Sequence, residues 1–262
     1  TTTELDAEAN LTFDGSTLNV VGNAGVGIAR TDGTLHVHTA SAGSVTASVH
    51  YDDLVVEGSG NTGISILAPE DYTSGIAFGS NNDNDIGHIY AQQSGTAGSR
   101  FMAFGVNAAE RMRIDSSGNI TKPTHCAFSG RSSDANNVTG DGTTYTISFG
   151  TEKYDLNGNL SGTTFTAPVN GRYSFCGKVR LGGITSSHTT GYVSLVTSNE
   201  SFIVHQTNPT NVAISGQAQL NWSHDCYMDA NDTATVTTML DGGSSDDIEV
   251  FGGCFFNGFL IA

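Results

Sequence analysis

The sequence is poor in residues that several protein classes need. Only 10 of its 262 residues are Lys or Arg, against 26 Asp or Glu, and charged residues make up 14% of the chain. The net charge of −16 is shared by both halves, with 14 acidic and 5 basic residues up to position 122 and 12 and 5 beyond it. An evenly acidic chain repels a phosphate backbone, so nucleic-acid binding is not expected.

Long apolar runs and paired cysteines are missing as well. No run approaches the ~20 apolar residues of a membrane-spanning helix, and no stretch is organised as a signal peptide, so membrane insertion is not expected. Whether an anchoring segment precedes Thr1 stays open. The cysteines at positions 126, 176, 226 and 254 form no C-x-x-C pair. We therefore favour buried free thiols over disulfides or a cysteine metal site.

Motifs of catalysis and nucleotide binding are equally scarce. The chain has no G-x-S-x-G elbow. Gly58, Gly60 and Gly63 have the G-x-G-x-x-G spacing, but a β-branched run reaches Pro69 soon afterwards and leaves no room for the helix that a phosphate loop needs. We interpret this loop as a hairpin connection and expect no enzyme. Carboxylates placed by the fold for glycoside cleavage remain an alternative.

What the chain does contain is typical of an all-β protein. It has 33 glycines, only 4 prolines, and short Val, Ile, Phe and Tyr runs between Gly, Ser, Thr and Asn. Residues 1–122 read as short hairpins with Asp, Gly or Ser turns, at 11–21, 30–38 and 113–120. Their apolar faces are too narrow for an independent core, which favours intertwining of several copies into a shaft.

Beyond a predicted linker at 119–125 the strands lengthen, which indicates a second domain at 123–262. In the segment from Gln217 to Met228, Ala218, Leu220 and Trp222 alternate with polar residues and share one face. This pattern predicts a β-sandwich, with Trp222 in the core or at an interface between copies.

The second domain resembles the globular heads of the complement one-q and tumour-necrosis-factor superfamily, which are trimeric jelly rolls. The resemblance covers most of residues 125–262 and includes "MDANDTATV" (228–236) and the ending "FFNGFLIA". Its densest part lies in residues 154–179, at Tyr154, Gly162, Phe165, Pro168, Gly171, Tyr173 and Phe175. The segment 180–215 has no close match, so the resemblance implies no ligand site in its loops.

The first 122 residues resemble bacteriophage tail-fibre and other virion-fibre proteins. The likeness lies in "LTFDGSTLNV", in "DDLVVEGSGNTGISILAP" and in the "ERMRI" segment (110–114) with its Ser-Gly turn. Together the two resemblances imply a homotrimer with an N-terminal intertwined β-hairpin shaft (1–122) and a C-terminal jelly-roll head (123–262).

Two metal sites are conceivable, although we count no cofactor as certain. His36 and His38 point to the same side of a predicted strand, so three chains would offer six imidazoles on a three-fold axis, as some phage fibres do. Loop carboxylates of the head offer oxygen ligands for calcium. These are Asp229, Asp232, Asp246, Asp247 and Glu249.

We interpret the chain as a structural virion protein made in the host bacterial cytoplasm. It would act as a tail fibre or spike in which weak contacts, multiplied by three heads, hold a host-surface glycan or protein. A capsid head fibre or decoration protein and a polysaccharide-degrading tailspike are the alternatives, and tail or capsid proteins are the expected virion partners. The predicted receptor contacts lie in three loops of the head, at Ser186, Ser187, His188, Thr189, Asn208, Asn211, Ser244, Ser245, Asp246 and Asp247.

Overall fold

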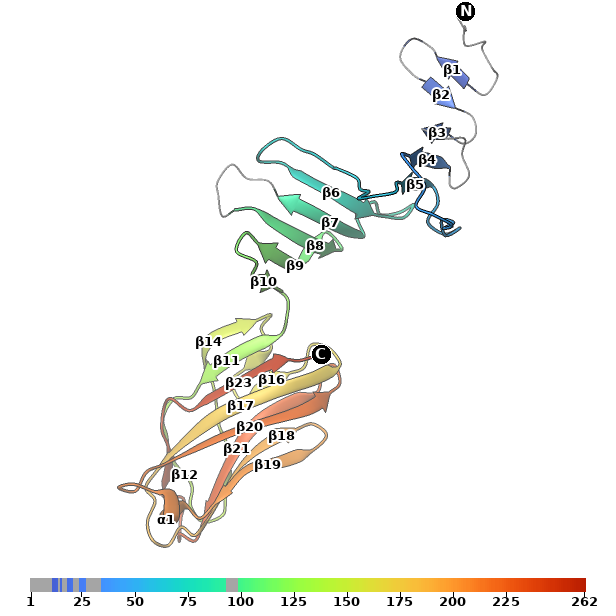
Figure 1. Ribbon diagram of the computed structural model, residues 1–262. Helices are drawn as coiled ribbons and strands as arrows, with labels where there is room; N and C mark the ends of the chain where they lie inside the picture. The colour runs from blue at the N-terminus through green and yellow to red at the C-terminus, as the bar shows by residue number, and fades with distance from the viewer. Residues whose placement is uncertain (1–10, 14, 16–17, 21–23, 27–33, 93–98) are drawn as a thin grey trace, which may run out of the picture. The chain divides into compact units, whose positions relative to one another are not determined.

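The computed structural model describes residues 11–13, 15, 18–20, 24–26, 34–92 and 99–262 of the chain. The chain divides into two compact units, residues 1–75 with 92–95 and residues 76–91 with 96–262. The described residues are mainly in strands, with α1 (Pro209–Val212) as their single helix (Figure 1). The predicted all-β class is confirmed.

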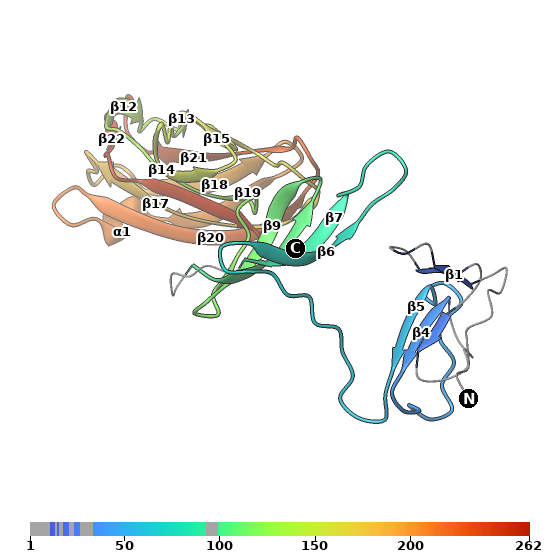
Figure 2. The ribbon, with the colours of Figure 1, turned by 90° about the horizontal axis from the view of Figure 1, so that it is seen from above.

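The first unit contains a hairpin and a small parallel sheet. β1 (Leu11–Phe13) and β2 (Leu18–Val20) pair antiparallel, as the Asp-Gly turn predicts. β3 (Ala24–Val26), β4 (Leu35–His38) and β5 (Leu54–Glu57) run parallel in register, and β4 and β5 lie side by side in Figure 2.

This parallel sheet corrects two predictions. A hairpin over residues 30–38 is wrong, because β4 pairs in parallel with β3 and β5, although residues 30–33 lie outside the described part. The connection of residues 39–53 is long enough to return the chain for parallel pairing. The glycine-rich loop is no hairpin connection either, since residues 64–67 form no strand, and no helix follows Gly63.

A five-stranded antiparallel sheet follows, in the order β10-β9-β8-β7-β6. β9 and β10 form the predicted 113–120 hairpin, with Ile114 opposite Ile120. The predicted linker is therefore partly strand, because Ile120 and Thr121 add to this sheet. The strands are β6 (Thr73–Phe78), β7 (Gly87–Gln92), β8 (Phe101–Val106), β9 (Ala109–Asp115) and β10 (Ile120–Thr121).

The head, from β11 onward, is a sandwich of two antiparallel sheets. The larger has the order β12-β22-β17-β23-β11-β14 with β20 on β17, and the smaller has the order β15-β16-β21-β18-β19 with β13 on β21. The strands of the larger sheet are β11 (Ala127–Arg131), β12 (Ala135–Thr139), β14 (Thr151–Leu156), β17 (Gly171–Gly182), β20 (Ala218–Met228), β22 (Ile248–Val250) and β23 (Phe255–Leu260). Those of the smaller sheet are β13 (Thr144–Thr146), β15 (Leu160–Ser161), β16 (Thr164–Thr166), β18 (Thr190–Thr197), β19 (Ser201–Thr207) and β21 (Thr233–Asp241).

This strand order confirms the predicted jelly roll. The first and last strands of the head, β11 and β23, are neighbours, and the chain passes repeatedly between the two sheets. The alternation predicted along β20 is present too, with Ala218, Leu220 and Trp222 buried and Gln219 and Asn221 exposed.

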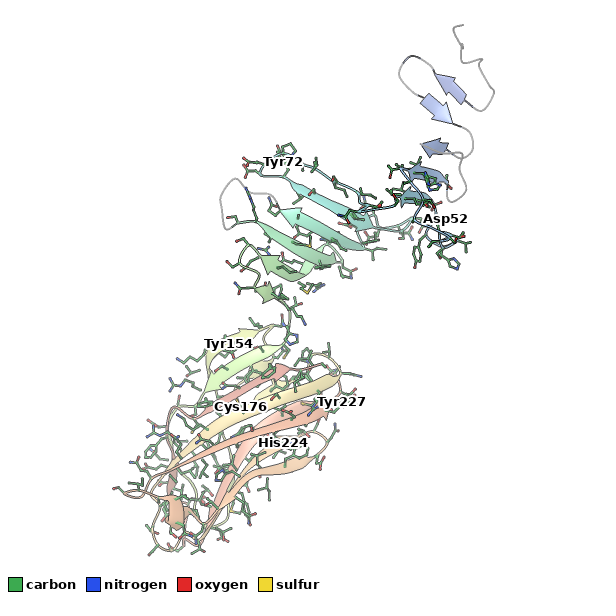
Figure 3. The ribbon with its side chains drawn as sticks, in the orientation of Figure 1. Asp52, Tyr72, Tyr154, Cys176, His224 and Tyr227 are labelled. Atoms are coloured by element: carbon green, nitrogen blue, oxygen red, sulfur yellow. The ribbon has the colours of Figure 1, made fainter. Side chains whose placement is uncertain are left out.

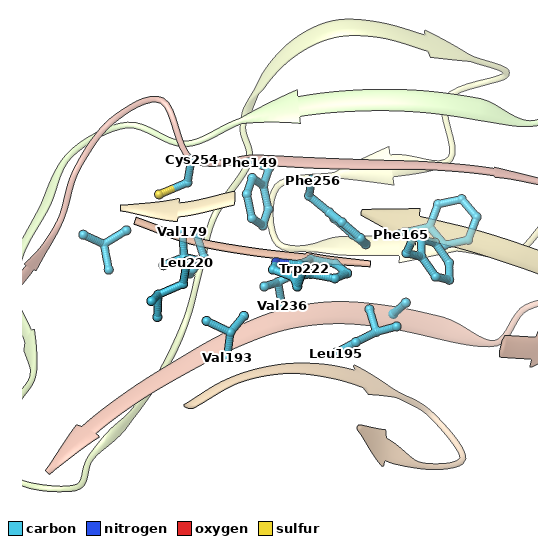
Figure 4. Close-up of a cluster of buried hydrophobic side chains, with 14 of the residues drawn as sticks. Phe149, Phe165, Val179, Val193, Leu195, Leu220, Trp222, Val236, Cys254 and Phe256 are labelled. Carbon is cyan, nitrogen blue, oxygen red and sulfur yellow. The ribbon is translucent and has the colours of Figure 1, made fainter. Parts of the chain in front are cut away.

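The core of the head is aromatic. Phe256 lies 4.9 Å from Phe128, 5.5 Å from Phe149 and Phe175, and 5.9 Å from Trp222, measured between ring centroids. Of these rings, Figure 4 labels Phe149, Trp222 and Phe256, together with Val193, Leu195 and Val236 of the facing sheet. Trp222 is 6% exposed, so its predicted place in the core is confirmed.

Candidate functional site

Several loops of the head meet at one end of the sandwich, away from the end that holds Ala127 and the C-terminus (Figure 1). They are residues 140–143 (between β12 and β13), 183–189 (β17–β18), 208–217 (β19–β20) and 241–247 (β21–β22). Backbone hydrogen bonds join them: Thr189 donates to Asp241 (3.1 Å), Ile184 to Gly216 (3.0 Å) and Gly243 to Gly140 (2.8 Å). We call these four loops the distal loops. All three predicted contact loops belong to them.

A buried histidine holds two of the distal loops together. The Nδ1 atom of His188 accepts a hydrogen bond from the backbone N–H of Thr185 (3.1 Å), so its Nε2 atom carries the proton and donates to Oδ1 of Asp247 (3.0 Å). The hydroxyl of Thr185 also lies 3.1 Å from Nδ1. Because the imidazole of His188 is fully buried, it braces the loops and cannot touch a receptor, which corrects its predicted role.

Another predicted contact residue is also structural. The side-chain oxygen of Asn208 caps α1, accepting from the backbone N–H of Thr210 (3.1 Å) and from its hydroxyl (2.7 Å). Asp246 is half-buried, and the side chain of Asp247 is 47% exposed. The remaining predicted residues are exposed and available for contact: Ser186, Ser187, Thr189, Asn211, Ser244 and Ser245.

The loop at 140–143 was not predicted as part of this surface. Gly140 has φ of 144°, and a Cβ there would lie 2.6 Å from both Oδ1 of Asp247 and the carbonyl of Ser245. Only glycine permits this backbone and this close approach. The sequence signal was the Asp-Gly pair at 141–142, which predicts a turn but does not say which other loop the turn will contact.

Two carboxyl groups meet beside this glycine. Burial raises the pKa of Asp246, and its hydrogen bond with the Asp141 carboxyl raises it further. The pKa of Asp141 is lowered, first by the hydroxyl and backbone N–H of Thr143. Asp246 therefore keeps its proton to a higher pH than an ordinary aspartate does.

The Asp246→Asn variant is expected to raise the melting temperature of the head slightly at pH 7. A group whose pKa is raised by folding stabilises the fold when protonated, and this contribution is lost as pH rises through the folded pKa. An amide mimics the protonated form at every pH, so the difference from the wild type should vanish below about pH 3.5. Thermal unfolding at pH 7 and at pH 3.5 measures this difference; an equal difference at the two pH values would contradict the raised pKa of Asp246.

The predicted histidine pair lies close to a carboxylate in the first unit. Nε2 of His36 lies 3.0 Å, and Nε2 of His38 3.7 Å, from Oε2 of Glu57. The pKa of Glu57 is lowered, first by the backbone N–H of Ala42 and then by these imidazoles. Since His36 is fully buried within one copy, it does not face outward toward a three-fold axis, and the predicted six-imidazole site does not fit.

The predicted calcium ligands are not gathered either. Asp232 is occupied by Ser198, Asn199 and the backbone of Asp229. In the described ranges, no group of three or more His, Cys, Asp or Glu side chains could hold a metal ion.

The four cysteines are free thiols, as predicted. Cys126 and Cys254 are buried, and burial raises the pKa of Cys126 and of the half-buried Cys226 to about 11. Cys176 is exposed and Cys226 is only half-buried, which corrects the prediction that all four are buried. Cys176, labelled in Figure 3, alternates onto the outer face of β17.

In the described part of the chain, no helix combines the length and the apolar character needed to cross a membrane.

No protein-family model matches the chain, and no curated protein matches its sequence. Among solved structures, the chain is similar to the globular domain of zebrafish complement 1qA protein, with 19% identity over 53% of this chain and 98% of that one and a TM-score of 0.36. It is also similar to murine APRIL, with 10% identity, coverage of 52% and 99%, and a TM-score of 0.36. A third similar structure is PRD1 vertex protein P5, with 12% identity, coverage of 53% and 99%, and a TM-score of 0.40.

Proposed function

We propose that the chain is a homotrimeric virion fibre or spike that attaches to a host-surface glycan or protein through the distal loops of its head. One observation carries the proposal: loops that are distant in the sequence meet at one end of the sandwich. The head begins at Ala127, and this residue lies at the opposite end. A contact surface at that end stays accessible while the other end continues into the rest of the chain. The fibre and jelly-roll resemblances of the sequence point the same way.

The chemistry of this surface suits weak, repeated contacts. Its exposed polar side chains are hydroxyls, an amide and carboxylates, which include the half-exposed Asp247, and the exposed apolar side chains of Val212 and Ile214 lie among them. Such groups match sugar hydroxyls and peptide groups. Three heads per fibre and several fibres per virion then turn weak single contacts into durable attachment. The proposal assigns binding to this surface and no catalytic step.

Lysine substitutions in the loops are expected to abolish attachment while the head stays folded. The variant Ser186→Lys, Asn211→Lys, Ser244→Lys changes one exposed residue in each predicted loop. Each bulky side chain obstructs the surface, so binding of the full-length protein to host cells should fall at least about tenfold. Flow cytometry with labelled protein measures the loss.

The matched control changes the opposite end of the head. Ser161→Lys, Thr166→Lys, Ala230→Lys adds the same charge at exposed positions and should bind like the wild type. Unchanged binding of the loop variant, or an equal loss in both variants, would refute the assignment.

Immunolabelling of virions with an antibody to the head tests the location: label on the tail supports attachment, and label spread over the capsid opposes it.

A further inference from the structure

The sheet of β6–β10 has two unlike faces. On one, the guanidinium of Arg113 lies 3.5 Å from the centre of the Phe101 ring and pairs with Glu110 (2.6 Å), while the hydroxyl of Tyr90 also reaches Glu110 (3.5 Å). These contacts stay within one sheet. This face therefore satisfies its own charges and needs no further layer.

The other face is apolar. Met102 is opposite Ile114, and Phe104 is opposite Met112, and these residues alternate with those of the polar face. Ile114 continues to Ile120 on β10, and the Phe78 ring lies against Gly87 of β7. We call this the apolar sheet face. Several of its side chains are about half exposed or more: Ile76 (52%), Phe78 (55%), Met102 (46%), Val106 (48%) and Ile120 (62%).

A sheet that is one layer thick with an apolar face needs a second layer. We propose that the apolar sheet face packs against the same face of two further copies of this chain, so that three sheets enclose a hydrophobic interior along the shaft. The inference rests on the trimer of the proposed function and assigns the surface that forms it.

The size of the face favours a second copy over an unrelated partner. Four strands of six or seven residues and the two-residue β10, about 4.8 Å apart, give roughly 400 Å², whereas a stable interface takes about 800 Å² from each partner. The remaining area must come from other segments. The same chain supplies them, since large apolar side chains are exposed through the preceding region: Val45, Val49, Tyr51, Ile64, Leu67 and Tyr72. A second copy carries the same exposed side chains, so it can supply this area from its own chain.

The distribution of charge also favours a second copy as the partner of the apolar sheet face. The chain carries −16, so copies brought together through most of their surface would repel each other. The residues that define the apolar sheet face carry no charge, and the ionic groups Glu110 and Arg113 lie on the opposite face. Three acidic chains can therefore meet at this face without bringing like charges into contact.

Cross-linking of the full-length chain tests the inference. In a Cys176→Ser background, which removes the exposed native thiol, Met102→Cys is expected to form disulfide-linked copies in high yield on mild oxidation. The matched control is Ile203→Cys on β19 of the head, an exposed strand residue of similar kind (58% exposed), which should stay uncrosslinked. Sedimentation should give the wild type the mass of three chains.

A second variant measures the energetic role of the face. The double variant Met102→Glu, Val106→Glu puts two charges on the apolar sheet face. We expect the concentration below which its trimer dissociates to be at least tenfold higher than that of the Ile203→Glu control. A single-chain mass for the wild type overturns the inference. So does a trimer in which Met102→Cys cross-links no better than the control. A trimer that cross-links as expected but fails to bind cells would count against the proposed attachment alone and would leave this surface assigned.

Discussion

The Phe256→Ala variant is expected to lose about 3 to 5 kcal/mol of unfolding free energy in the head. Phe256 is fully buried and its ring packs against Phe128, Phe149, Phe175 and Trp222. Alanine removes the apolar area of the ring and leaves a cavity between two sheets, which cannot close because both are fixed by their strand pairing. Aromatic contacts add to the loss beyond buried area.

Trp222 makes this measurement selective. It is the single tryptophan of the chain and lies in the core of the head, so its fluorescence during denaturant unfolding reports the head alone. Phe259→Ala is the control, since Phe259 lies on the same strand but is 50% exposed, and it should lose less than about half as much. A loss below about 1 kcal/mol for Phe256→Ala would show that the head is not packed around this ring.

The His188→Ala variant is expected to release the distal loops and to abolish attachment. It removes the hydrogen bond to Asp247 and leaves the backbone N–H of Thr185 without its acceptor, which costs about 1 to 3 kcal/mol. Since the loops at 183–189 and 241–247 meet around this imidazole, both should lose their order. Hydrogen exchange by mass spectrometry should show faster exchange in these two segments and little change in β17 and β23.

His205→Ala is the matched control, because His205 bonds the carbonyl of Asn221 outside the distal loops. It should leave loop exchange and cell binding at wild-type values. If His188→Ala exchanged and bound like the wild type, the brace would be unnecessary and the surface would have another support.

Local patterns in the sequence predicted much of the fold. Alternation placed Trp222 in the core, and Asp-Gly and Ser-Gly turns located the hairpins at 11–21 and 113–120. These predictions succeed because a strand face and a tight turn depend on neighbouring residues. The parallel pairing of β4 with β3 and β5 was missed, because pairing between strands separated by long connections leaves no local pattern.

In the candidate site, too, local sequence patterns predicted some features, and the fold alone decided the others. The sequence identified its exposed serines and Asn211 as loop residues but assigned His188 to the surface, because a polar residue in a loop is usually exposed. Only the fold shows that the loop at 241–247 supplies Asp247 to this histidine and that Gly140 makes room for Asp247 and Ser245. Likewise, Cys176 alternates onto an outer face while Cys126 and Cys254 are buried.

By itself, the sequence determined that this is an acidic, all-β chain with short N-terminal hairpins and a β-sandwich head, because composition, turn residues and two-residue alternation are local properties. The jelly-roll topology of the head was implied by the resemblance to a known superfamily. The tertiary structure decided which loops meet, which polar side chains are buried between them, and which sheet face stays uncovered. These outcomes depend on contacts between residues far apart in the chain, such as His188 with Asp247, which no local pattern encodes.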